Sequence, residues 1–105
     1  MFTVVKNPTF RCPATIHVPT DDGVTTQTLT VRFRLFEAVE EPGPDVDFLR
    51  HVIVSLEDLV DESDAPVPYC DEVRDQLLKR GYVRKGLIQA YFNTVNGAEA
   101  TARGN

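Results

Sequence analysis

Two stretches of apolar and polar alternation near the amino terminus constrain the fold of this 105-residue chain more than any other feature. In residues 9–18 the even positions are apolar, and in residues 28–35 the odd positions are apolar. Because successive side chains of a strand point to opposite faces of a sheet, each stretch predicts a half-buried strand. Pro13 has no N–H to donate, so the first strand should lie at a sheet edge or carry a bulge there.

The segment between these strands predicts a tight reversal. Residues 19–23 contain the pair Asp22-Gly23, which supplies a residue that tolerates positive φ, and the two strands should therefore form an antiparallel hairpin. A two-stranded ribbon is marginal in water, so helices are needed to cover its apolar face. We expect that face to carry Phe10, Ile16, Val31 and Phe33. A short flanking strand is also expected at Phe2, Val4 and Val5.

A first helix is predicted after a breaker-rich connection at residues 37–46. Asp45 or Asp47 can cap it, and the run Val52-Ile53-Val54 makes a strand the competing interpretation of its second half. Its apolar face would carry Phe48, Leu49, Val52, Ile53 and Leu56.

Two further helices are predicted after an exposed loop at residues 61–68. The first begins with Asp71 as its N-cap and carries Val73, Leu77 and Leu78 before Gly81 ends it. The last helix places one apolar stripe before Asn96-Gly97, made of Val83, Leu87, Ile88, Tyr91, Phe92 and Val95.

The predicted fold class is therefore α+β. An amino-terminal antiparallel β-hairpin or small sheet packs against two to three short α-helices, and residues 1–97 form a single domain. Residues 98–105 are small and polar and predict a disordered tail.

The charge distribution argues against several classes of partner. The net charge is -5, and 13 of the 16 acidic residues lie between positions 37 and 75, which disfavours binding to nucleic acid. The first six residues do not resemble a signal peptide, and the longest apolar run is too short to span a membrane, so we expect a cytoplasmic protein. Cys12 and Cys70 are then expected to be free thiols.

The sequence contains no pattern that indicates catalysis or cofactor binding. A phosphate-binding Gly-rich loop, a Cys-x-x-Cys pair and a His-x-x-x-His pair are all missing from it. A metal site at His51 with Asp47 or Glu57 fits helical spacing but is not favoured, and Cys70 lies beside acidic residues that disfavour its thiolate. We therefore expect no enzyme activity, no catalytic residue, no metal and no cofactor.

The aromatic residues instead indicate a binding protein. Tyr serves partly exposed contacts well, although packing in the core is the alternative for each ring. The candidate contact residues for a partner are Leu56, Tyr82, Tyr91 and Phe92.

Three stretches together resemble the tail assembly chaperone family of long-tailed phages and prophages. Residues 2–10, with Asn-Pro-Thr-Phe at their end, resemble the start of that family. Residues 48–69 are similar to the block in which an apolar helix leads through an acidic turn to a Pro-aromatic pair. Residues 77–95 are similar to the closing helices with their Ala-Tyr pair, here Ala90-Tyr91. Ser55 and Leu56 depart from the family pattern, which often has Gly and Trp there.

The resemblance implies a protein that binds the tape measure protein and keeps it soluble while tail tube subunits assemble around it. Contact between an amphipathic client helix and a groove suits this role, and the acidic middle of the chain would keep the complex soluble. The alternative is a structural minor tail or connector subunit that stays in the virion. The sequence leaves the oligomeric state open.

Overall fold

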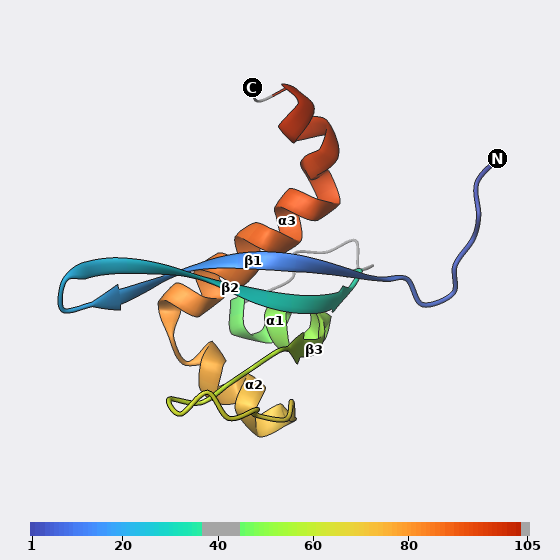
Figure 1. Cartoon of the computed structure of the whole chain (residues 1–105). Helices are drawn as coiled ribbons and strands as arrows, with labels where there is room; N and C mark the ends of the chain where they lie inside the picture. Colours follow the sequence, from blue (N-terminus) through green and yellow to red (C-terminus); the bar gives the residue numbers. More distant parts are fainter. Residues whose placement is uncertain (37–44, 104–105) are drawn as a thin grey trace.

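A computed structural model describes residues 1–36 and 45–103, and the side chains of the last helix as far as Asn96. Strands β1 (Thr9–Thr20) and β2 (Gly23–Arg34) form the predicted antiparallel hairpin, in which Cys12 lies opposite Val31 (Figure 1). Asp21 and Asp22 form the turn, and Gly23 follows with a φ of 121°. Glycine is favoured there because an L side chain rarely adopts that backbone conformation.

A third strand replaces the second half of the predicted first helix. Helix α1 (Asp45–Val52) ends where β3 (Ile53–Glu57) begins, and β3 pairs antiparallel with β2 to give the sheet order β1-β2-β3. The prediction of a continuous helix to Leu56 is therefore wrong, and the competing strand is correct from Ile53. Residues 53–57 gain backbone hydrogen bonds to β2, and their β-branched residues suit a pleated surface.

The sheet confirms the expected position of Pro13 but not the flanking strand. Strand β1 is an edge strand, so the missing N–H of Pro13 removes no hydrogen bond from the interior of the sheet. Residues 1–5 form no strand, and Phe2 and Val4 are exposed. Figure 1 shows this segment leaving the end of the sheet, where no strand edge lies beside it.

Helices α2 (Asp71–Leu78) and α3 (Gly81–Arg103) follow an exposed loop at residues 61–68, as predicted. Their ends differ from the prediction. Cys70, not Asp71, occupies the N-cap position of α2, and it makes no side-chain cap hydrogen bond. Helix α2 ends at Leu78 with Lys79 as its C-cap residue, whose φ of -69° is helical, so no glycine is needed and Gly81 opens α3 instead.

Helix α3 is longer than predicted. It continues through Asn96 and Gly97 to Arg103. A single glycine inside a helix costs only about 1 kcal/mol, which does not end it. The predicted disordered tail, residues 98–105, coincides with these last turns and stays a prediction, and residues 104–105 lie outside the described residues, as do 37–44 of the breaker-rich connection.

The fold is α+β, as predicted, with helices packed on one face of a three-stranded sheet (Figure 1). In the hairpin the buried residues alternate along each strand: Cys12, Ala14 and Ile16 on β1 and Val31 and Phe33 on β2. Helix α3 crosses β1 closely at Gly86. A Cβ atom at that position would lie 2.6 Å from the carbonyl oxygen of Thr15. The core that results comprises Cys12, Ala14, Ile16, Val31, Phe33, Phe48, Leu49, Val52, Ile53, Leu56, Leu78, Val83, Leu87, Ala90 and Tyr91.

Arg84 connects all three helices. Its Nε donates to the Asp45 carboxylate of α1 at 3.0 Å, and its Nη1 donates to the Leu78 carbonyl oxygen at the end of α2 at 2.7 Å. The last carbonyls of a helix have no partner within it, so a cation at this position satisfies one of them. The guanidinium therefore fixes the angle at which α3 leaves α2.

Candidate functional site

A groove lies between the hairpin and helix α2. It consists of a pocket of about 380 Å³ and a neighbouring pocket of about 170 Å³, which share Leu59, Val60, Leu77 and Arg80. We call these two pockets together the apolar groove. Its other apolar residues are Ile16, Val18, Leu29, Val67, Val73, Tyr82 and Val83.

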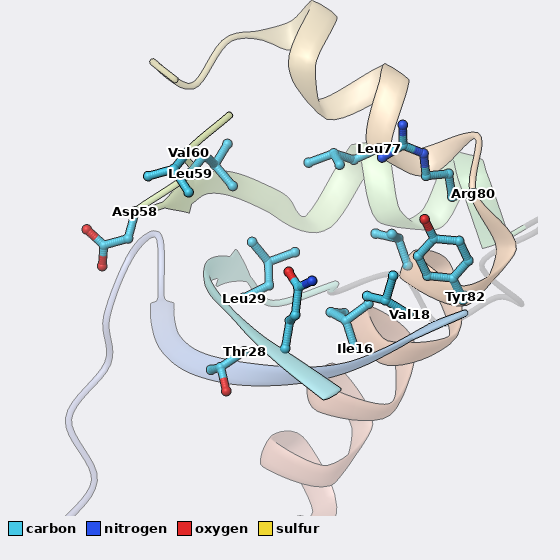
Figure 2. A pocket seen from close by; sticks show the side chains of 12 residues that line it. Ile16, Val18, Thr28, Leu29, Asp58, Leu59, Val60, Leu77, Arg80 and Tyr82 are labelled. Carbon is cyan, nitrogen blue, oxygen red and sulfur yellow. The ribbon is translucent and has the colours of Figure 1, made fainter. Parts of the chain in front are cut away.

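Three parts of the chain build the apolar groove (Figure 2). Ile16, Val18 and Leu29 come from the core face of the hairpin and form its floor. Leu59 and Val60 lie on one side, and Leu77 of α2 lies across from them. Such an apolar floor and walls suit the apolar stripe of a bound helix or strand.

The turn at Asp58 opens this groove. Asp58 has a φ of 59°, in the left-handed region that Asp tolerates better than most residues. It follows Glu57, the last residue of β3, and turns the chain away from β2. Leu59 and Val60 therefore face the floor from across a gap instead of continuing the sheet.

Charged groups lie at the rims of the groove. Asp58 lines one side and Arg80 lines the other. The acidic loop that follows Val60 is held in shape by Asp61, whose carboxylate accepts hydrogen bonds from the backbone N–H groups of Ser63 at 2.8 Å and Ala65 at 3.1 Å. The loop thus presents its acidic side chains to solvent beside the groove.

The structure separates the four predicted contact residues into two groups. Tyr82 is half-buried and lines the apolar groove, and Phe92 is 41% exposed on α3 and stacks on Phe48 with ring centroids 5.6 Å apart. Leu56 and Tyr91 are buried in the core, where their side chains hold the sheet and α3 together. Phe92 lies next to Tyr91, with ring centroids 5.0 Å apart. Tyr82 lines the groove instead, so the two exposed candidates, Tyr82 and Phe92, belong to different surfaces.

Three groove residues were not predicted as contacts from the sequence: Leu59, Val60 and Leu77. Val60 is 56% exposed although it is a β-branched apolar residue. The available signal was the pair Leu59-Val60 directly before an acidic loop, because this apolar pair lies outside the apolar faces of the predicted helices and strands.

The two cysteines and His51 were the other residues with possible chemistry. Cys12 is buried and Cys70 is exposed, and both thiols are free. His51 is exposed and packs edge-on against the Phe36 ring at 5.2 Å. Within residues 1–36 and 45–103, no group of three or more His, Cys, Asp or Glu residues is placed to hold a metal ion. None of the described helices has the length and apolar content that a bilayer crossing requires.

An ion-pair cluster connects α1 and α2 beside the groove. Asp75 accepts a hydrogen bond from Arg74 Nε at 3.0 Å and another from Arg50 Nε at 3.1 Å. The hydrogen bond from Arg74 and the charges of both guanidinium groups lower the pKa of Asp75. Partial burial raises the pKa of the neighbouring Tyr69 hydroxyl.

This cluster predicts a pH dependence of stability. Because the pKa of Asp75 is lower in the folded chain, its contribution is present above its unfolded pKa of about 3.9 and is lost as pH falls through the folded pKa. Urea unfolding of Asp75→Asn at a series of pH values should show less loss of stability below about pH 4 than the wild type. Glu72→Gln, at an exposed position on the same helix, is the control and should keep the wild-type slope. Equal slopes for wild type and Asp75→Asn would contradict the assignment.

The whole chain matches no protein-family model, no curated protein and no solved structure. The family that the sequence resembles therefore stays a proposal, and the function is inferred from the residues and the groove that they form.

Proposed function

We propose that this chain is a non-enzymatic phage or prophage tail assembly chaperone that binds the tape measure protein and keeps it soluble during tail assembly. The observation that carries the proposal is the apolar groove, which leaves Val60 exposed and places Tyr82 at the surface. The order of the three stretches that resemble the family supports it. They extend from residue 2 to residue 95.

The groove suits an amphipathic client helix. Such a helix buries residues at i, i+3, i+4 and i+7 in an apolar trough, and it leaves its polar flanks at the rims. Arg80 on one rim and Asp58 on the other can pair with charges of either sign on those flanks. Burial of apolar surface supplies most of the affinity, and the rim charges favour one orientation of the helix.

The proposal implies a location and a set of partners. The protein would act in the cytoplasm of the bacterial host, and the tape measure protein would be its client. Tail tube subunits would meet the complex as they displace the chaperone from the client. Neither nucleic acid nor a membrane has a role in this scheme.

A second candidate is a structural minor tail or connector subunit. The specific observation in its favour is the outer edge of β2, of which β3 covers only the part from Thr30 to Phe33 in the described chain. A free strand edge can pair with a neighbouring subunit. Mass spectrometry of purified particles distinguishes the two functions, because a structural subunit should be abundant there and a chaperone should be missing.

Co-expression with the tape measure protein of the same phage or prophage tests the proposed function. The soluble fraction of the tape measure protein should rise severalfold, and the two proteins should co-purify, because the groove masks apolar stripes that otherwise aggregate. An unchanged soluble fraction without co-purification would refute the proposal.

A further inference from the structure

Among the described residues, only part of the outer edge of β2 has a strand beside it. Strand β3 pairs with β2 between Thr30 and Phe33, whereas residues 24–28 pair only with β1 in the part of the chain that is described. The chain leaves the sheet at Asp58, immediately after β3 ends. Figure 1 shows the turn of the hairpin projecting past β3. We call residues 24–28 the open edge.

The open edge presents hydrogen-bonding groups to a fourth strand. Pro13 lies opposite Thr30 and has no N–H, so these two residues form a pair that is not hydrogen-bonded across β1 and β2. The alternation of an antiparallel ladder then directs the backbone N–H and C=O groups of Thr26 and Thr28 away from β1. A strand placed in line with β3 could form backbone hydrogen bonds with these groups.

The side chains of such a strand would meet the apolar groove. Val18 and Leu29 lie on the core face of the hairpin at this end and form part of the floor of the groove. Alternate residues of an added strand point to that face, so the strand needs an apolar residue at every second position. Short side chains between them can face solvent.

One segment of the chain itself has these properties. Residues 1–7, the amino-terminal arm, form no helix or strand and extend from the end of the sheet. Phe2 and Val4 are 90% and 86% exposed and are spaced by two, with Thr3 between them. Exposed apolar side chains that lie together, as Phe2, Val4 and Val5 do, can mark a surface that a partner covers.

The arm cannot reach the open edge of its own sheet. The arm is attached at Thr9, and Thr15, which pairs with Thr28, is six residues further along β1, a span of about 20 Å at 3.3 Å per residue. Val4 is five residues before Thr9, so it lies at most about 18 Å from that residue and falls short of the open edge. An arm bound at the open edge would therefore belong to another molecule.

The charges of the arm and of the open edge are complementary. The arm carries Lys6 and no acidic residue. Asp58 lies near one end of the open edge, and Asp21 and Asp22 form the turn at the other end. Lys6 is spaced by two from Val4, so in an added strand it would point to the same face at one end of the open edge, near a carboxylate in either direction of the strand.

We propose that the amino-terminal arm of a second copy of this chain binds along residues 24–28 as a fourth strand, with Phe2 and Val4 in the apolar groove. Main-chain hydrogen bonds supply part of the affinity, and the two apolar side chains supply the specificity. The arm would occupy the same groove that the proposed function gives to the client, so the two would compete for it. The test of self-association contains no tape measure protein, and it can therefore fail or succeed independently of the proposed function.

Sedimentation velocity of the full chain over a range of concentrations tests this proposal. The average mass of the wild type should rise with concentration, and Val4→Asp should weaken association at least about tenfold, because it places a carboxylate in an apolar site. Thr3→Asp is the matched control. It adds the same charge to the same arm but on the face that points to solvent, so it should associate like the wild type.

A second variant tests the edge itself. Thr28→Pro removes an outward N–H that β1 does not use, so the hairpin should fold and association should weaken as in Val4→Asp. The circular dichroism spectrum of each variant verifies folding. A wild type that stays monomeric throughout, or equal weakening by Val4→Asp and Thr3→Asp, would overturn the proposal. Unchanged association in a folded Thr28→Pro variant would also overturn it.

Discussion

Replacement of Gly86 by alanine should destabilise the protein by about 1–3 kcal/mol, although alanine is the better helix former. An added Cβ would lie 2.5 Å from Cδ1 of Ile16 and 2.6 Å from the carbonyl oxygen of Thr15. The Ile16 side chain can rotate, but the Thr15 oxygen belongs to the backbone of β1. Helix α3 would have to move away from the sheet, which would loosen the core. Urea unfolding measures the change in the free energy of unfolding.

Gly81 provides a matched control in the same helix. A Cβ there would meet only the guanidinium of Arg84, at an ordinary contact distance of 3.6 Å. Gly81→Ala should therefore be neutral or stabilise the protein by up to about 1 kcal/mol, through helix propensity alone. If Gly86→Ala were as stable as Gly81→Ala, the close crossing of α3 over β1 would be contradicted.

Replacement of Tyr91 by alanine should cost about 3–5 kcal/mol, enough to unfold much of a small domain. The Tyr91 ring is buried and contacts four other rings, with centroid distances of 5.0–5.7 Å. Its hydroxyl accepts a hydrogen bond from the backbone N–H of Phe36 at 2.8 Å. The four rings are those of Phe10, Phe33, Phe48 and Phe92.

Tyr91→Phe separates the two contributions. It keeps the ring but leaves the N–H of Phe36 without its partner, so about 1–3 kcal/mol should be lost. Thermal and urea unfolding of both variants provide the measurement. A Tyr91→Ala variant with wild-type stability would show that the ring is not part of the core.

The hairpin could be predicted from sequence because its information is local. Alternation with a period of two from Thr9 onward identifies each strand, and a glycine directly after two acidic residues identifies the turn. Pro13 further indicated the edge position, which depends only on the chemistry of one residue. Each of these features is determined by the segment that contains it.

The change from α1 to β3 could not be predicted in the same way. The spacing of Phe48, Leu49 and Val52 fits a helical face, and Ile53 and Leu56 continue that spacing, so period alone does not reveal the end of the helix. What decides the outcome is the free edge of β2, a distant element with which Ile53 to Glu57 pair. Tertiary context overrides local preference here.

The candidate site was only partly predictable for the same reason. Tyr82 was selected for its chemistry and does line the apolar groove. Leu59 and Val60 reach the groove because Asp58 turns the chain and α2 packs opposite them, and these are relations between elements. The burial of Leu56 and Tyr91 likewise depends on how α3 crosses the sheet.

A pair of aspartate variants tests most directly whether the apolar groove is the client-binding surface. Val60 lies in the groove and Val95 lies on α3, and their side chains are 56% and 44% exposed, so aspartate at either position should leave the fold intact. Each variant is co-expressed with the tape measure protein, and the amount that co-purifies is measured. Val60→Asp should lower it at least about tenfold and Val95→Asp should not change it, because an Asp is costly only where the client covers it. Full binding by a folded Val60→Asp variant would contradict binding in the groove. Loss of binding by Val95→Asp alone would indicate that the client binds α3 instead.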